Sequence, residues 1–123
     1  MKKEKNFCPI RNILDRFGDK WSIIVLMELE SHNSLRYNDL WRMIPDISER
    51  MLAITLRKLE ADNLIHRKEY LQVPPRVEYS LTPIGLSLIP HIKNLVKWAL
   101  DNGVIIMESR ENYIKDNKNK HLK

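Results

Sequence analysis

Residues 48–82 read SERMLAITLRKLEADNLIHRKEYLQVPPRVEYSLT, and they contain the clearest secondary-structure signals of the chain. Its first half repeats apolar residues at the spacing of an α-helix. Its second half holds two short runs rich in β-branched and aromatic residues, and two adjacent prolines separate these runs. We therefore predict a helix followed directly by a small β-hairpin, in a chain whose other segments are mainly helical.

The predicted helix has an apolar side and a polar side, because successive residues turn by about 100°. Four residues gather on the apolar side: Leu52, Thr55, Leu56 and Leu59. Four others gather on the opposite side: Arg50, Ala53, Ile54 and Arg57. Arginine can bond guanine edges, and small apolar side chains can contact thymine methyl groups, so we predict that the second set reads bases in double-stranded DNA. The alternative is an ordinary surface helix whose charges are solvated.

Both ends of this helix carry local signals. Ser48 can cap its start with the side-chain hydroxyl, although Asp46, followed three residues later by Glu49, is a rival cap. Asn63 stands where helices often end in a left-handed residue, a conformation that asparagine tolerates. The helix is therefore predicted to span about residues 48–62.

The hairpin carries basic residues on both sides of a stiff tip. Its strands are predicted at Leu64–Leu71 and Arg76–Leu81, and the two prolines between them restrict the backbone. Three basic residues flank the tip and are predicted to contact DNA phosphates: Arg67, Lys68 and Arg76. The alternative is a solvent-exposed hairpin whose arginines pair with Glu69 and Glu78.

A second amphipathic segment precedes the helix. A short helix is predicted from an apolar stripe at helical spacing: Tyr37, Leu40, Trp41 and Ile44. Pro45–Asp46 supplies the turn into the next helix. Two helices joined by a short turn form a helix-turn-helix, and with the hairpin they predict a winged helix-turn-helix. Arg36 and Ser48, near the starts of the two helices, are predicted to contact phosphates.

Helices are also predicted on both sides of this unit. One begins at Pro9 and ends at Gly18, and the next, capped by Asp19, is apolar nearly all round and should form the buried centre. After the hairpin, a helix begins at Thr82–Pro83, with a kink or a late start expected at Pro90. Asn102–Gly103 is predicted to end it before a final helix. Because these last helices carry more apolar surface than so small a domain covers alone, we predict a two-fold homodimer through the terminal helices.

Length and charge limit the possible classes of protein. The chain has 123 residues, enough for one small domain, and a formal net charge of +5. The excess charge lies in the termini, because residues 1–5 carry +2 and residues 110–123 carry +3. We assign residues 8–114 to the domain, between a mobile basic arm at 1–7 and a frayed basic tail at 115–123. The absence of a long apolar run or signal peptide predicts a cytoplasmic protein without membrane contact.

Several motifs together resemble the HxlR family of bacterial winged-helix transcriptional regulators, which are related to the MarR group. The matching segments are Cys8–Pro9, Gly18–Trp21, Leu35–Leu40, Ile47–Ser48, Leu56–Asp62 and Val73–Gly85. The resemblance implies a homodimer that binds DNA. The chain departs from the family at candidate base-reading positions, where family members tend to have Lys in place of Arg50, Thr in place of Ala53 and a polar residue in place of Ile54.

Cys8 is the only cysteine, which excludes an internal disulfide. It lies just before a predicted helix start, where the helix dipole favours a thiolate. Several HxlR-type regulators use a cysteine at the matching position to sense oxidants or electrophiles such as quinones. We therefore consider Cys8 a candidate redox-sensing residue, with a packed, inert cysteine as the alternative.

Other classes of function fit the sequence less well. A metal sensor requires clustered ligands, whereas the four histidines are scattered, and no enzyme motif or cofactor-binding loop is present. The main alternative is a winged helix that binds protein rather than DNA. The three tryptophans, Trp21, Trp41 and Trp98, are expected in the core, with a small aromatic effector pocket as the alternative.

Overall fold

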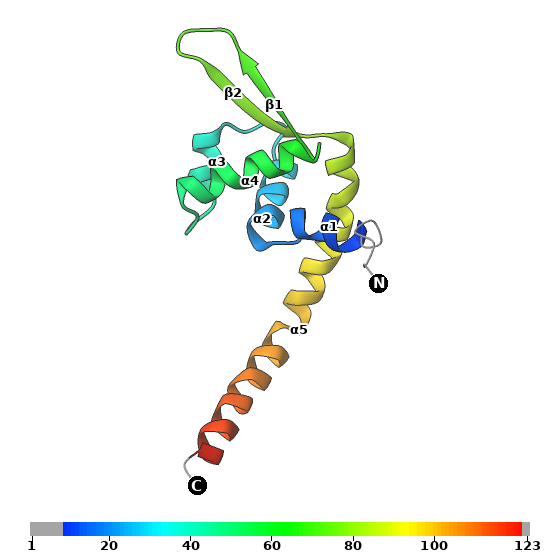
Figure 1. The fold of residues 1–123 in the computed structure, drawn as a ribbon, viewed down its shortest axis with the longest axis vertical. Coiled ribbons are helices and arrows are strands. Elements are labelled where there is room, and N and C mark those ends of the chain that lie inside the picture. Colours follow the sequence, from blue (N-terminus) through cyan, green and yellow to red (C-terminus); the bar gives the residue numbers. More distant parts are fainter. Residues whose placement is uncertain (1–8, 122–123) are drawn as a thin grey trace, which may run out of the picture. The chain divides into compact units, whose positions relative to one another are not determined.

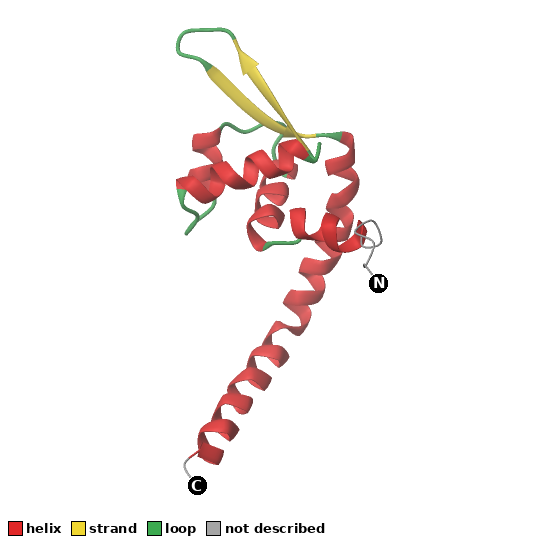
Figure 2. Cartoon of the chain, viewed as in Figure 1, coloured by secondary structure: helices red, strands yellow, loops and turns green. Residues whose placement is uncertain are grey.

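The computed structural model describes residues 9–121, and residues 1–8 and 122–123 lie outside its described part (Figure 1). In chain order, this part contains five helices and two strands: α1 (Pro9–Phe17), α2 (Lys20–Glu30), α3 (Tyr37–Met43), α4 (Glu49–Ala61), β1 (Ile65–Tyr70), β2 (Arg76–Leu81) and α5 (Pro83–His121). A mainly helical fold with one antiparallel hairpin confirms the prediction (Figure 2). The chain divides into two compact units, with the boundary between Ile89 and Pro90.

Helix α2 lies at the centre of the first unit, as its apolar sequence predicts. Val25, Leu26 and Leu29 are almost completely buried, and α2 packs on α1, α3, α4 and β2. Helix α4 adds three buried leucines to this core: Leu52, Leu56 and Leu59. Each fully buried leucine contributes about 1.5–3 kcal/mol relative to an exposed one. This burial determines which side of α4 faces inward.

The tryptophans lie mostly outside the core. Trp41 and Trp98 have exposed fractions of 43% and 57%, and Trp21 is half-buried with the Lys20 ammonium 4.6 Å from its ring centroid. The expectation of core tryptophans is therefore wrong for Trp41 and Trp98. Leucine and isoleucine fill most of the core, and large indole rings are rarely buried completely.

Helices α3 and α4 form the predicted helix-turn-helix. The turn between them buries Ile44 and Ile47 and passes through Asp46, whose φ of 70° is tolerated by aspartate better than by most residues. Ser48 is the N-cap of α4, and its hydroxyl oxygen accepts a hydrogen bond from the Met51 N–H at 3.0 Å. Of the two caps that the sequence offers, the structure uses Ser48, while Asp46 forms the turn.

The end of α4 is joined to the base of the hairpin. Asn63 has a φ of 59°, and the N–H groups of Asn63 and Leu64 donate to carbonyls of the preceding helical turn, which confirms the predicted left-handed ending. The Thr82 hydroxyl donates to the Asn63 carbonyl at 2.6 Å and accepts from the Gly85 N–H at 3.0 Å. A Cβ at Gly85 would lie 2.1 Å from the Leu64 carbonyl oxygen, so only glycine fits. Helix α4, the hairpin and the start of α5 therefore meet at this junction.

Strands β1 and β2 form the predicted wing, with Ile65 opposite Leu81 at its base. Figure 1 shows the hairpin projecting away from α3 and α4. Leu35 adds a third segment, because its backbone exchanges hydrogen bonds of 2.9 and 2.8 Å with Tyr79 on β2. This contact is not predicted from the sequence, and it places the following residue, Arg36, beside the wing.

A single helix, α5, takes the place of the two C-terminal helices predicted from the sequence. It continues through Pro90 and Gly103, so of the two alternatives expected at Pro90 the late start does not occur, and the predicted end at Asn102–Gly103 is wrong. The Asn102 amide donates to the Trp98 carbonyl at 2.9 Å inside the helix, and a helical glycine costs only about 1 kcal/mol relative to alanine. The helix also continues beyond Lys115, the predicted start of a frayed tail, to His121.

The second unit carries many exposed apolar side chains along α5. They are Leu95, Trp98, Leu100, Val104, Ile105, Met107, Tyr113 and Ile114. Each is at least half exposed in the single chain. Apolar surface of this extent on one helix is typical of an interaction surface.

Candidate nucleic-acid interface

The outward side of α4 combines two exposed arginines with two half-buried apolar residues. We call these residues the reading face: Arg50, Ala53, Ile54 and Arg57. Within residues 9–121, no carboxylate pairs with either guanidinium of this face. Both guanidinium groups are therefore available to external acceptors, and their planar geometry suits bidentate contacts with guanine or phosphate.

The N-terminus of α4 is fixed by Tyr37 on α3. The Tyr37 hydroxyl donates to the Glu49 carbonyl at 2.8 Å, and burial, followed by the neighbouring Glu49 charge, raises the pKa of Tyr37. The phenol therefore stays a protonated donor at neutral pH. The Ser48 hydroxyl accepts from Met51 and keeps its own proton for another acceptor. The sequence shows Tyr37 only as part of an apolar stripe, so this linking role is not predicted.

Arg36 lies at the N-cap of α3, next to the wing. Its backbone N–H donates to one carboxylate oxygen of Asp39 at 3.1 Å, and Arg42 donates to the other at 2.8 Å. The backbone hydrogen bond from Arg36, and then the bond from Arg42, lower the pKa of Asp39. The Arg36 backbone is therefore held at the junction of the helix-turn-helix and the wing, and its exposed side chain is accessible to a DNA backbone there.

Both wing arginines are paired with carboxylates of their own strands. Arg67 pairs with Glu69 on β1, and Arg76 pairs with Glu78 on β2. The Tyr70 hydroxyl donates to the other Glu78 oxygen at 2.9 Å. Hydrogen bonds from Tyr70 and then Arg76 lower the pKa of Glu78, so this carboxylate is ionised at neutral pH. The ion pairs that the sequence offers as an alternative are thus formed, and a phosphate would have to compete with them.

Lys68 differs from the wing arginines because, among the described residues, it forms no ion pair. Its ammonium lies 4.9 Å from the Tyr70 ring centroid, and the Arg76 guanidinium lies 5.3 Å from the same centroid. Lys68 stands opposite Glu78 in the strand register, so these residues share one face of the wing. Arg67 lies on the other face. Lys68 is therefore on the same side of the hairpin as Tyr70, Arg76 and Glu78.

Three further features bear on function: the candidate redox cysteine, possible metal ligands and possible membrane-spanning segments. Cys8, the candidate redox residue, lies outside residues 9–121. Over those residues, no three metal-ligating side chains come together. None of the helices described is both long enough and apolar enough to cross a lipid bilayer.

The sequence of the chain matches a family of known proteins. The model of the family described as HxlR-like helix-turn-helix matches residues 16–105. The HTH-type transcriptional regulator YybR of Bacillus subtilis is 40% identical over 108 residues, which cover 88% of this chain and 86% of YybR.

Two solved structures of regulators illustrate the similarity in fold. The redox regulator HypR in its reduced form has 39% sequence identity and a TM-score of 0.74, over 81% of this chain and 98% of the HypR chain. The transcriptional regulator ytfH from Salmonella typhimurium has 36% identity and a TM-score of 0.76, over 85% of this chain and 93% of its own. These likenesses confirm the winged-helix fold class and the prediction of a transcriptional regulator that is not an enzyme.

Proposed function

The chain belongs to the HxlR-like helix-turn-helix family of transcriptional regulators, and from this premise we propose that it binds double-stranded DNA sequence-specifically as a homodimer. The observation that carries this proposal is the reading face, whose two arginines are exposed and unpaired within the described chain. In the proposed complex, residues 48–62 lie in the major groove and the wing at 64–81 contacts the backbone or the minor groove.

The reading face has the chemistry needed to distinguish base pairs. Arg50 and Arg57 are seven residues apart, about two helical turns, so they are suited to bases or phosphates on separate steps of one groove. Ala53 and Ile54 between them are suited to thymine methyl groups. Because the side chains that differ from the family pattern stand here, this protein is expected to have its own preferred operator sequence.

Phosphate contacts are assigned to residues at the edges of this surface. Arg36 and Lys68 are exposed, and Ser48 has a hydroxyl proton to donate, so these three can bind phosphate without breaking an ion pair. Arg67 and Arg76 would contact phosphate only by sharing or leaving their glutamates. The wing is therefore proposed to add sequence-independent affinity, supplied first by Lys68.

Dimerisation is supported by the exposed apolar side chains of α5, and by those of α1 at Ile10, Ile13 and Leu14. A single chain leaves these residues in water, whereas a second copy would cover them. A two-fold dimer would present two reading faces to half-sites about 34–36 Å apart, one turn of DNA.

Redox control through Cys8 is a further part of this proposal. Two observations support it: Cys8 immediately precedes α1, which begins at Pro9, and the chain is 39% identical to the redox regulator HypR. Diamide or a quinone should release wild-type protein from DNA, whereas Cys8→Ser should remain bound. Equal release of both proteins would exclude sensing by Cys8.

Binding to DNA upstream of the protein's own gene tests the main proposal. Fluorescence anisotropy would compare this duplex with a random duplex of equal length at several salt concentrations, for wild type and Arg57→Ala. Arg57→Ala should lose about 1–3 kcal/mol of specific binding if Arg57 bonds a base edge. The control is Arg110→Ala, which removes the same charge from an exposed position on α5. Equal binding of both duplexes by wild type would favour the protein-interaction module instead.

A further inference from the structure

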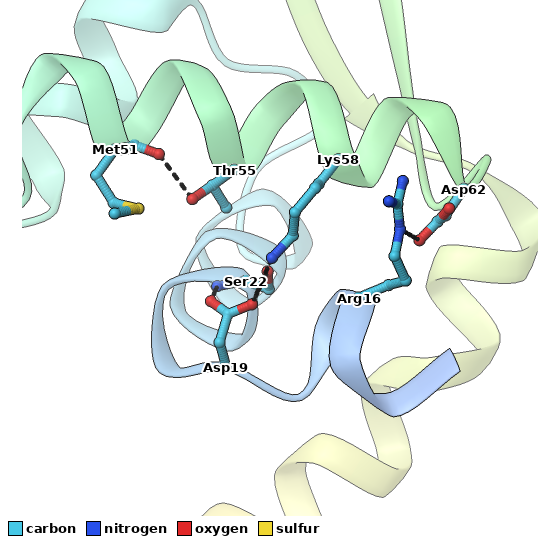
Figure 3. Close-up of polar contacts among 7 residues, drawn as sticks. All are labelled: Arg16, Asp19, Ser22, Met51, Thr55, Lys58 and Asp62. Atoms are coloured by element: carbon cyan, nitrogen blue, oxygen red, sulfur yellow. Dashed lines mark hydrogen bonds and ion pairs between the residues drawn. The ribbon is translucent and has the colours of Figure 1, made fainter. Parts of the chain in front are cut away.

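One flank of α4 carries a second row of contacts, about a third of a turn from the reading face. Four residues recur along it at helical spacing: Met51, Thr55, Lys58 and Asp62. Figure 3 shows this row facing the corner between α1 and α2. Toward the N-terminus the row is internal to α4, because the Thr55 hydroxyl donates to the Met51 carbonyl at 2.7 Å. Toward the C-terminus of α4, residues of this row contact α1 and the start of α2.

Two charged pairs join this flank to the α1–α2 corner (Figure 3). The Lys58 ammonium donates to Asp19 Oδ2 at 2.9 Å, and Arg16 Nε donates to Asp62 Oδ2 at 2.9 Å. We call these four residues the flank cluster. All four side chains are only 30–41% exposed, so water screens the pairs incompletely.

Asp19 has a double role in the flank cluster. Its other carboxylate oxygen accepts the Ser22 N–H at 2.9 Å, which caps α2, the most buried helix of the first unit. Burial alone would raise the pKa of Asp19, but hydrogen bonds from Lys58 and Ser22 outweigh it and leave this pKa lowered. Lys58 is therefore attached to a carboxylate that the core helix already holds in place.

Directional contacts are needed to fix the rotation of α4 about its own axis. The buried leucines hold α4 against the core, but hydrophobic attraction is non-directional and tolerates small rotations. Hydrogen bonds between charged groups are directional, and Lys58 and Asp62 are four residues apart, about 6 Å along the axis. A rotation of about 10° would move side-chain ends at a radius of about 5–6 Å by about 1 Å.

We propose that Arg16, Asp19, Lys58 and Asp62 are positioning residues, which set the rotation of α4 and so direct the reading face at base edges. This inference rests on the proposed function. Base contacts need groups held within about 0.5 Å, whereas attraction to phosphates extends over about 8 Å at physiological salt. Disturbing the flank cluster should therefore reduce discrimination between DNA sequences more than it reduces general affinity for DNA.

Lys58→Met is the most direct variant, because it removes the pair while retaining an unbranched apolar stem and leaving the Ser22 cap untouched. The measured quantity is the ratio of dissociation constants for random and preferred duplexes, determined by competition. The ratio should fall about fivefold or more, the equivalent of one weakened base contact. Lys58→Arg should restore most of it. Lys118→Met, which removes the same charge from an exposed position on α5, should leave the ratio unchanged.

The Arg16–Asp62 pair can be tested by exchanging its two charges between the two positions. Arg16→Asp places two carboxylates together and should lower the ratio of dissociation constants more than Lys58→Met does. Arg16→Asp combined with Asp62→Arg should return this ratio to within about twofold of wild type. Thermal unfolding of each variant separates an effect on the orientation of α4 from an effect on the stability of the fold. A lower unfolding temperature with an unchanged ratio would overturn the positioning role and leave a purely stabilising one.

The positioning role can also be tested if the protein does not bind DNA sequence-specifically. Wild type that shows no preference among duplexes would refute sequence-specific binding. In that case residual dipolar couplings, measured by NMR without DNA, still report the rotation of α4 relative to α2. The same orientation in wild type and Lys58→Met would overturn the positioning role, and a changed orientation would support it.

Discussion

The reading face and the wing both carry arginines, but in opposite electrostatic states. Arg50 and Arg57 are exposed and have no carboxylate partner among the described residues, whereas Arg67 and Arg76 are each paired with a glutamate. A free guanidinium gains its full interaction with a base or phosphate. A paired one must first weaken an existing contact, so its net gain is smaller. Arginines on α4 are therefore expected to contribute to selectivity between DNA sequences, whereas arginines on the wing are expected to contribute mainly to sequence-independent affinity.

The largest effect is expected from removing both free arginines. Arg50→Ala/Arg57→Ala should lose about 2–6 kcal/mol of specific binding, because each base contact contributes about 1–3 kcal/mol and the sites are two helical turns apart. Binding to random DNA should fall much less. The matched double variant Arg67→Ala/Arg76→Ala removes the same charge from the wing. An equal loss of selectivity in both double variants would contradict the distinction between the two regions.

A uniform loss is expected from removing the unpaired wing cation. Lys68→Ala should weaken binding to all sequences alike and reduce the slope of log affinity against log salt by about 0.9, because one phosphate contact is lost. Anisotropy titrations at four or five salt concentrations measure this slope. A sequence-dependent effect of Lys68→Ala would instead place this lysine at a base edge.

A gain of affinity is expected from releasing a paired arginine. Glu78→Gln frees Arg76 on the face shared with Lys68, and should increase the salt slope by up to about 0.9 with little change in selectivity. Glu69→Gln frees Arg67 on the other face and is the matched control. The larger gain identifies the face of the wing that meets DNA. No gain from either variant would show that the wing does not approach the backbone.

The smallest effect concerns stability in acid. The pKa of Asp19 is lowered in the folded state, so its contribution is present above its ordinary pKa and is lost as pH falls through the folded pKa. Because the pair with Lys58 is partly exposed, the contribution should be under about 1 kcal/mol. The unfolding free energies of wild type and Lys58→Met in urea should differ at pH 7, and this difference should shrink progressively as the pH falls below about 4. A difference that does not shrink as the pH falls below about 4 would have another origin.

Local chemistry could be predicted from the sequence, and contacts between distant segments could not. Ser48 and Asn63 are recognisable because caps depend on a few neighbouring residues. The Lys58–Asp19 pair spans 39 residues, and no local pattern indicates it. Gly103 shows the opposite error, since a local stop signal is outweighed by helix-forming residues on both sides. The wing charges permit both pairing and phosphate contact, and only the structure shows that the pairs form.

The junction of Asn63, Leu64, Thr82 and Gly85 has a consequence for how operators diverge. It separates the residues proposed to read bases, which precede it, from the helix proposed to join two copies, which follows it. One residue inserted into α5 beyond Gly85 would rotate everything after it by about 100° and shift it by about 1.5 Å. The distance and phase between two half-sites could thus change without any substitution on α4. Operator spacing and operator sequence are therefore expected to vary independently among proteins with this architecture.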